Sequence, residues 1–303
     1  ALNGKPFVKR IIFEENKTTL SFEFFPPSRD GNIEELYRAI KDLSELNPDF
    51  ISVTYGAGGS TRDKTVEIAS TIKNEYGRET LAHLTCVQAT RDDIREQLDR
   101  LSEKGIENIL ALRGDPPKDE DHFVKTEGGF RYANELVEFI KQHGDFSIGV
   151  AGYPEVHPEA PDMEHDLINL KKKVDAGADF IITQMFFDNE YFYRYRDHAI
   201  STGIRVPIIP ALFPIFNYKQ ITRIASLCGA KIPQKLADKL SKVSEKNEEV
   251  EKYGIEHAII QSENLLGNDV SGLHFYSMNR SGHVIRIIEE LPKKLFENNS
   301  VLE

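Results

Sequence analysis

Short apolar runs recur along the chain and alternate with amphipathic stretches, and no other feature of the sequence limits the fold as much. Eight such runs, rich in β-branched and aromatic residues, begin at Thr19, Phe50, Leu81, Asn108, Phe146, Phe180, Val206 and Gly272. Parallel strands need a crossover connection, usually a helix, so this alternation predicts a parallel sheet covered by helices. Eight strand and helix units close naturally into a barrel. We therefore predict an α/β protein with the (β/α)8 TIM-barrel fold.

The stretches between the runs have helical patterns. Those starting at Asn32, Arg91 and Met163 carry apolar residues near positions i, i+3, i+4 and i+7, the spacing of one helix face. Gly105 and Gly177 follow two of them, where helices commonly end on glycine. A doubly wound sheet is the alternative, but it usually has fewer strands and a GxGxxG turn after the first strand. No such turn occurs here.

The connection between the seventh and eighth runs, residues 231–268, is long and charged, and it predicts extra helices at that point. Charge runs are usually wet helix faces, so we expect residues 235–254 to form a solvated helical hairpin and not a binding tail. No change of composition marks a domain boundary. Residues 1–303 are therefore predicted to form a single domain.

Composition excludes several classes of protein. The chain has 38 Lys and Arg against 49 Asp and Glu, a net charge of −11, so its overall field repels nucleic acid. Cys86 and Cys228 lack the spacing of a disulfide framework or a zinc site, which favours a reducing cytoplasm. No apolar run resembles a signal peptide or a membrane span, so we expect no membrane partner.

Polar residues follow seven of the eight predicted strands. Barrel enzymes carry their chemistry on the loops after the strands' C-terminal ends, so these residues are candidates for one shared pocket. They are Glu23, Thr54, Tyr55, His83, Arg113, Gly114, Asp115, Tyr153, His157, Gln184 and Arg280.

Glu23 lies in the run SFEFFPP, between aromatic residues and before two prolines. Burial against apolar surface favours the neutral carboxyl, so we expect a raised pKa and a role as a general acid. The alternative is a buried carboxylate paired with an arginine from a neighbouring strand.

Two loops combine glycine with charge. The run VTYGAGGSTRDKT could bring backbone close to a phosphate or a ring, although its glycines also suit an ordinary turn. In LRGDPP, Arg113 and Asp115 flank Gly114. A mutual ion pair on the surface is the alternative there, but the position after a strand favours ligand binding.

The stretch from Tyr153 to Gly177 is the richest in candidate groups. Asp166, Asn169 and Lys173 share one helix face, which could bind the ribose and diphosphate of a dinucleotide, although exposed helices also carry such residues. None of the 9 histidines has HxH, HExxH or similar spacing, so no metal site is predicted.

Seven motifs together carry a resemblance to a known family. They are SFEFFPP, SVTYGAGGSTRD, HLTC, ALRGDPP, AGYPEVHPEA, NLKKKVDAGADFIITQ and HFYSMNR, and they occur in matching order from about Thr18 to Arg280. The chain closely resembles the catalytic barrel of methylenetetrahydrofolate reductases. The resemblance implies a cytoplasmic, flavin-binding homo-oligomer of one-carbon metabolism and methionine biosynthesis. It implies ping-pong transfer of hydride from NADH or NADPH, through non-covalent FAD, to 5,10-methylenetetrahydrofolate.

The resemblance also assigns roles to residues. Glu23 would be the general acid that protonates N10 of the folate, and Asp115 would stabilise the resulting iminium cation. Gln184, Gln220 and Arg280 would contact substrate, and Gln184 and Thr54 the nicotinamide. The positions that would line the FAD site are Thr54, Tyr55, Ala57, His83, Arg113, Gly114, Asp115, Tyr132, Ala133, Tyr153, His157, Ala160, Asp166, Asn169, Lys172 and Lys173.

Two positions depart from the family pattern. Ile224 stands where bacterial relatives can place an aromatic residue that stacks on substrate, and Lys172 stands where an arginine can occur. The chain resembles the short, bacterial type, without a regulatory domain. A Schiff-base lyase is disfavoured because no predicted strand contains a lysine. A barrel that binds a pterin or flavin without catalysis would be expected to lack Glu23 or Asp115. The choices of NADH or NADPH, and of FAD or FMN, stay open.

Overall fold

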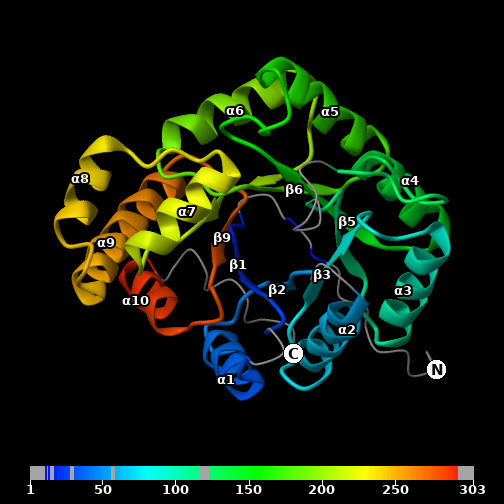
Figure 1. Ribbon diagram of the computed structural model, residues 1–303, viewed down its shortest axis with the longest axis horizontal. Coiled ribbons are helices and arrows are strands. Elements are labelled where there is room, and N and C mark those ends of the chain that lie inside the picture. Colours follow the sequence, from blue (N-terminus) through cyan, green and yellow to red (C-terminus); the bar gives the residue numbers. More distant parts are fainter. Residues whose placement is uncertain are drawn as a thin grey trace.

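A ring of parallel strands forms the centre of the computed structural model, with helices around its outside (Figure 1). The structure describes residues 11, 13, 17–27, 31–55, 59–115 and 123–292. The strands are β1 (Thr19–Phe24), β2 (Phe50–Val53), β3 (Thr80–Thr85), β4 (Asn108–Leu112), β5 (Ser147–Gly152), β6 (Phe180–Thr183), β7 (Ile208–Ile209), β8 (Ala211–Leu212) and β9 (Gly272–Tyr276). Their order in the sheet is β7-β6-β5-β4-β3-β2-β1-β9-β8. The predicted TIM barrel is confirmed.

The barrel closes through a strand that Pro210 divides into β7 and β8. Proline has no N–H to donate, so the strand cannot form one uninterrupted ladder. Before it, β7 pairs with β6, and after it, β8 pairs with β9. The Pro210 carbonyl accepts a hydrogen bond from the His274 N–H at 3.1 Å. The segment 206–212, predicted as one strand, therefore bonds to both neighbours and completes the ring.

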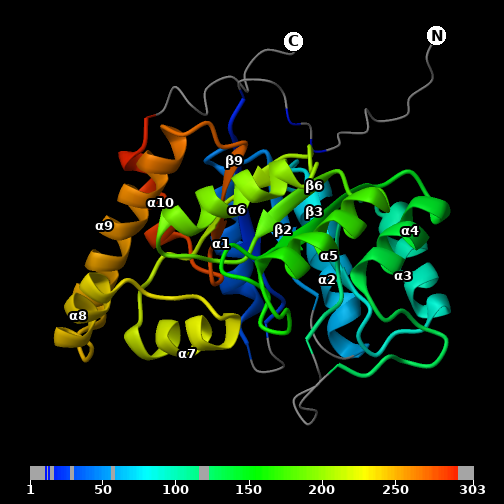
Figure 2. The same ribbon diagram turned by 90° about the horizontal axis from the view of Figure 1, so that it is seen from above.

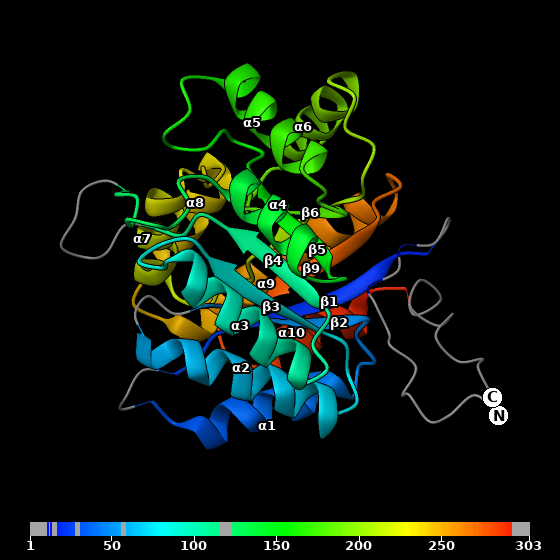
Figure 3. The same ribbon diagram turned by 90° about the vertical axis from the view of Figure 1, so that its right-hand side faces the viewer.

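Helices cover the outside of the ring, and Figure 3 shows α2, α3 and α4 side by side along it. Extra helices were predicted within residues 231–268 and are confirmed as α8 and α9, which follow α7 between the seventh and eighth predicted strands. Figure 2 shows α7 displaced toward one end of the barrel. The helices are α1 (Ile33–Ser44), α2 (Gly59–Asn74), α3 (Arg91–Glu103), α4 (Ala133–His143), α5 (Met163–Asp175), α6 (Asn189–Ser201), α7 (Tyr218–Cys228), α8 (Gln234–Lys242), α9 (Asn247–Leu266) and α10 (Gly282–Glu290).

Helix boundaries follow local chemistry. The Asn32 side chain accepts from the first backbone N–H groups of α1, and Thr90 forms a capping box with Asp93 at the start of α3. Gly105 and Gly177 follow the ends of α3 and α5 with φ values of 75° and 119°, which glycine adopts without strain. The predicted glycine helix ends are confirmed.

Apolar side chains pack on both sides of the strands. Phe50, Leu81 and Phe180 belong to a cluster inside the barrel, whereas Phe22 and Phe24 belong to the larger layer under the helices. Strands buried on both faces read as continuous apolar runs, which is why all of them could be found in the sequence. Side chains alternate along β1, so Ser21 and Glu23 face the opposite way from the two phenylalanines, into the barrel.

The hairpin predicted over 235–254 is confirmed as α8 and the start of α9. Leu240 and Val250 are buried beneath it, and its charged residues are largely exposed. Gly254 in α9 packs directly on the backbone of Ile215, and a Cβ atom at this glycine would lie 1.8 Å from the Ile215 carbonyl oxygen. Within the described ranges, no helix combines the length and apolar character needed to cross a membrane.

Candidate functional site

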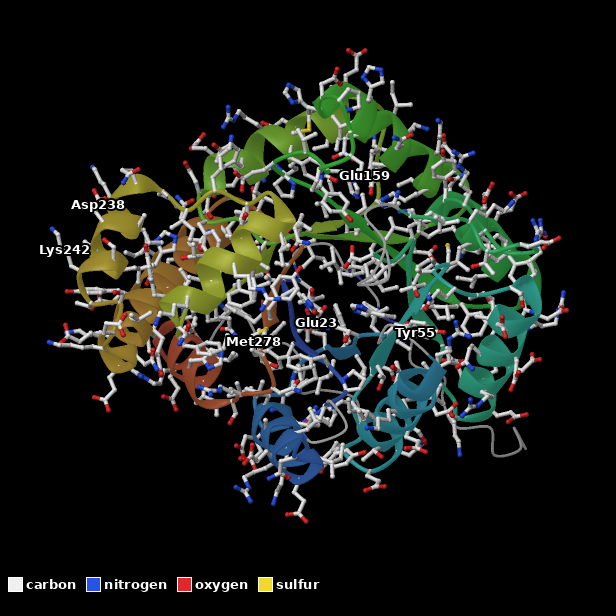
Figure 4. All side chains as sticks on the ribbon, in the orientation of Figure 1. Glu23, Tyr55, Glu159, Asp238, Lys242 and Met278 are labelled. Carbon is white, nitrogen blue, oxygen red and sulfur yellow. The ribbon has the colours of Figure 1, made fainter. Side chains whose placement is uncertain are left out.

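Glu23 lies at the centre of the ring of strands (Figure 4). Its Oε2 atom is 3.4 Å from Nε2 of His83 on β3 and 3.6 Å from Nε2 of His274 on β9. The Ser52 hydroxyl donates a hydrogen bond of 3.4 Å to the same oxygen, and Ser21 Oγ lies 2.8 Å from Nδ1 of His274. The carboxylate therefore sits between two imidazoles, one of them held by a serine.

These neighbours determine the charge of Glu23. Burial is the strongest single influence and would raise the pKa, but His274 and His83 together lower it from 4.5 to about 2. The predicted raised pKa is therefore wrong for this structure, and the carboxylate's partners are histidines and not an arginine. The aromatic residues beside Glu23 in the sequence face the other side of the strand, and its partners come from distant strands.

This lowered pKa predicts how stability depends on pH. Because the folded pKa lies below the ordinary value of 4.5, the stabilisation is present above about pH 4.5 and is lost as pH falls toward 2. We expect the difference in free energy of unfolding between the parent and Glu23→Gln to fall by about 2 kcal/mol from about pH 5 to about pH 3. Urea titrations at both pH values measure it, and an unchanged difference would contradict the lowered pKa.

Buried polar atoms at the ends of β2 and β3 have no hydrogen-bond partner within the described structure. They are the Tyr55 hydroxyl and Oγ1 of Thr85. Burial raises the pKa of Tyr55 to about 12, and the Arg62 guanidinium lies 5.8 Å from the centre of its ring. Unpaired buried polar atoms are costly, so these groups fit a polar ligand that bonds to them. Sequence reasoning missed Thr85, although its spacing of two from His83 in a strand places both on one face.

A cleft of about 510 Å³ opens between the loops that follow β4 and β5 and the helices α4 and α5. Most of the expected cofactor-binding residues line it. They are Arg113, Tyr132, Ala133, Tyr153, His157, Ala160, Asp166, Asn169, Lys172 and Lys173. The fold thus brings these residues, which come from separate loops and helices, together in one cleft.

The α5 side of the cleft combines both signs of charge. The buried Asp166 carboxylate accepts a hydrogen bond from the His157 N–H at 3.1 Å, and burial raises its pKa. The Lys173 amine donates to the Ala151 carbonyl at 2.6 Å, and burial lowers its pKa to about 8. Asp166, Asn169 and Lys173 line the same cleft, which confirms that they share one face of α5.

Arg113 forms its ion pair with Glu159, a residue that sequence reasoning missed, and not with Asp115. Two hydrogen bonds of 2.7 and 2.5 Å join the guanidinium to the Glu159 carboxylate. Gly114 has φ of 88°, and a Cβ atom there would lie 2.7 Å from Cγ1 of Val87, so this turn requires glycine. Asp115 is exposed.

The remaining predicted residues lie in other places. The Gln184 N–H donates to the Gly152 carbonyl at 2.7 Å, and the Thr54 N–H donates to the Phe24 carbonyl at 2.9 Å. Ala57 lies outside the described residues. A second pocket of about 300 Å³ contains both Gln220 and Arg280, so the predicted residues do not all line the cleft. The other residues lining this pocket are Phe216, Asn217, Asn247, Glu248 and Glu251.

Ile224, one of the two departures from the family pattern, is half-buried and packs against the apolar cluster that contains Met185 and Phe213.

In the part of the chain that the structure describes, no three His, Cys, Asp or Glu side chains are arranged to hold a metal ion. The site thus offers a carboxylate and two imidazoles in the barrel, and an adjoining cleft with polar and charged walls. This arrangement suits proton transfer beside an elongated polar ligand.

Comparisons with known proteins agree with this description. The family model for methylenetetrahydrofolate reductase matches residues 8–292. The chain is 42% identical over 267 residues to 5,10-methylenetetrahydrofolate reductase of Escherichia coli strain K12, covering 88% of each. It is 41% identical over 293 residues to methylenetetrahydrofolate reductase (NADH) 1 of Arabidopsis thaliana, covering 93% of this chain and 50% of the relative. The chain thus spans about half the length of that plant relative.

Among solved structures, an uncharacterised protein from Clostridium thermocellum that binds two copies of 5-methyl-5,6,7,8-tetrahydrofolic acid has a similar fold. The TM-score is 0.56 and the sequence identity 15%, with 90% of this chain and 93% of that chain covered. At this identity the likeness concerns the fold alone.

Proposed function

The chain belongs to the methylenetetrahydrofolate reductase family, and we propose that it reduces 5,10-methylenetetrahydrofolate to 5-methyltetrahydrofolate, with NADH as the hydride donor and bound FAD as the carrier. One observation supports this most. The predicted cofactor residues of two loops and two helices gather in a single cleft of about 510 Å³ at the end of the barrel. The names of the plant relatives specify NADH, which supports this donor over NADPH.

The described residues fit a flavin dinucleotide. The unpaired Tyr55 hydroxyl and Thr85 Oγ1 could bond to the polar edge of a flavin ring. Asp166 and Arg113, in the cleft, suit a ribose and a diphosphate, and these favour FAD over FMN. When bound, the flavin would accept a hydride from the nicotinamide and then pass it to the folate, as a ping-pong reaction requires.

In this proposal Glu23 protonates N10 of the folate and so opens the five-membered ring. Its low pKa means that it must gain a proton when substrate binds. Burial has the strongest influence on the pKa of this carboxyl and raises it, whereas His83 and His274 lower it. A ligand that bonds to the Nε2 atoms of the two histidines would weaken their hold on Glu23, and burial would then favour the protonated acid.

The other assignments complete the proposal. Asp115 places a negative charge where the iminium cation forms, which lowers the energy of that cation. Thr54 and Gln184 contact the nicotinamide, and Gln184 also contacts the folate. Gln220 and Arg280 bind the folate in the second pocket, where Arg280 supplies a positive charge. We propose one flavin-binding domain that acts as a homo-oligomer in the cytoplasm, where its free Cys86 and Cys228 would stay reduced.

An anaerobic absorption experiment tests this function. The purified protein, supplied with FAD, should show flavin bands near about 450 nm, lose them when NADH is added, and regain them when methylenetetrahydrofolate follows. Each half-reaction is thus seen separately. A protein that takes up neither FAD nor FMN would contradict the flavin, and bands that bleach with NADH but do not return with the folate would contradict the substrate.

A further inference from the structure

The ion pair between Arg113 and Glu159 lies in the wall of the cleft. Arg113 belongs to the loop after β4, Glu159 to the loop before α5, and both line the cleft wall. Figure 4 shows Glu159 on the inner side of α5. The two hydrogen bonds use both terminal nitrogens of the guanidinium, the arrangement in which arginine also binds phosphate. Glu159 therefore occupies the donors that a phosphate would use.

The two partners differ in how firmly they are held. Arg113 is 21% exposed, and its guanidinium lies 5.0 Å from the centre of the Phe123 ring. The Glu159 side chain is 53% exposed, although its backbone is fixed by a hydrogen bond of 3.0 Å from its N–H to Nδ1 of His157. When an anion enters, the glutamate side chain can thus turn into water while the arginine stays in place.

The other cations of the cleft do not remove this competition. The Lys173 amine is already bonded to the Ala151 carbonyl, and the Lys172 amine lies 3.4 Å from Oδ1 of Asn169. Pairing with Arg113 lowers the pKa of Glu159, so its carboxylate is ionised at neutral pH. A diphosphate that approaches Arg113 is therefore repelled by the negative charge of the Glu159 carboxylate.

We propose that Glu159 is an internal competitor for Arg113, which weakens the binding of a diphosphate-containing flavin and speeds its release. The inference rests on the proposed function, because it takes FAD as the ligand of the cleft. It makes Glu159 a residue that sets cofactor affinity, distinct from the groups that handle the proton or the hydride.

The test compares the protein with its Glu159→Gln variant after loading with FAD. On dilution, the rise of FAD fluorescence gives the rate of release and the final level gives Kd. We expect both to be lower by about five-fold in Glu159→Gln, because an exposed pair and its like-charge repulsion together contribute on the order of 1 kcal/mol. Riboflavin, which has no phosphate, should bind both proteins equally after FAD is stripped.

Glu164→Gln is the matched control, because it removes the same charge as Glu159→Gln. Glu164 is exposed in the first turn of α5 and is not among the residues that line the cleft. This variant should release FAD at the parent rate. Equal or faster release from Glu159→Gln, or an equal gain for riboflavin, would overturn the inference. Failure of the parent protein itself to bind FAD would instead contradict the proposed function.

Discussion

Replacing Glu23 by glutamine should slow folate reduction about a thousand-fold while the flavin is still reduced by NADH at nearly the parent rate. Glutamine keeps the size of the side chain but cannot deliver a proton, and general acid catalysis contributes about this much to a rate. Only the folate half-reaction needs that proton. Anaerobic stopped-flow spectroscopy measures the two half-reactions separately, with the bleaching and the return of the flavin bands as the signals.

The Glu23→Asp variant serves as the control. Aspartate retains an acidic proton but shortens the side chain by one methylene, so the folate half-reaction should be slowed less than in Glu23→Gln. Folate reduction by Glu23→Gln within about ten-fold of the parent would show that another group supplies the proton. If both half-reactions slowed equally, Glu23 would be needed for the structure of the flavin site and not as the acid of the folate half-reaction.

The Gly254→Ala substitution should destabilise the protein by about 3 kcal/mol. The added Cβ would lie 1.8 Å from the carbonyl oxygen of Ile215 and 2.7 Å from its carbonyl carbon. Backbone atoms cannot rotate away as a side chain does, so α9 would have to move from its place beside α6, α8 and α10. Urea denaturation followed by circular dichroism measures the loss.

Gly267 gives the matched control, because it caps the same helix. Its φ is −74°, and a Cβ atom there would come no closer than 3.5 Å to other atoms. Gly267→Ala should therefore leave the free energy of unfolding unchanged or raise it slightly, since alanine lowers the entropy of the unfolded chain. Equal losses in the two variants would mean that close packing on Ile215 does not set the position of α9.

The strands and several helices could be predicted because their signals are local. Strands buried on both faces appear as apolar runs, and helices are bounded by caps and glycines that lie within a few residues. The shared face of Asp166, Asn169 and Lys173 could be predicted for the same reason, since their spacing lies within one helix. These parts of the site needed no knowledge of distant contacts.

The failures concern pairs that are distant in sequence. Glu23 meets His83 and His274 from β3 and β9, and nothing near it in the chain indicates either histidine. Arg113 and Glu159 are 46 residues apart, so nothing in the sequence indicated Glu159, and a pair with the neighbouring Asp115 was only the alternative to ligand binding. The division of the seventh strand at Pro210 could have been anticipated, because proline cannot donate to a ladder.

The pairing of β1 with β9 affects the order in which the protein can be completed during synthesis. Thr19 pairs with Gly272 and Glu23 with Tyr276, so the first strand of the barrel bonds to the last. His274, which accounts for part of the charge state of Glu23, is among the last barrel residues to leave the ribosome. A nascent chain that has already formed its first strands still lacks this contact, because β9 has not yet been synthesised. The low pKa of Glu23 therefore depends on synthesis of β9. A chain cut short before this strand would leave Glu23 without one of the two histidines that keep it ionised.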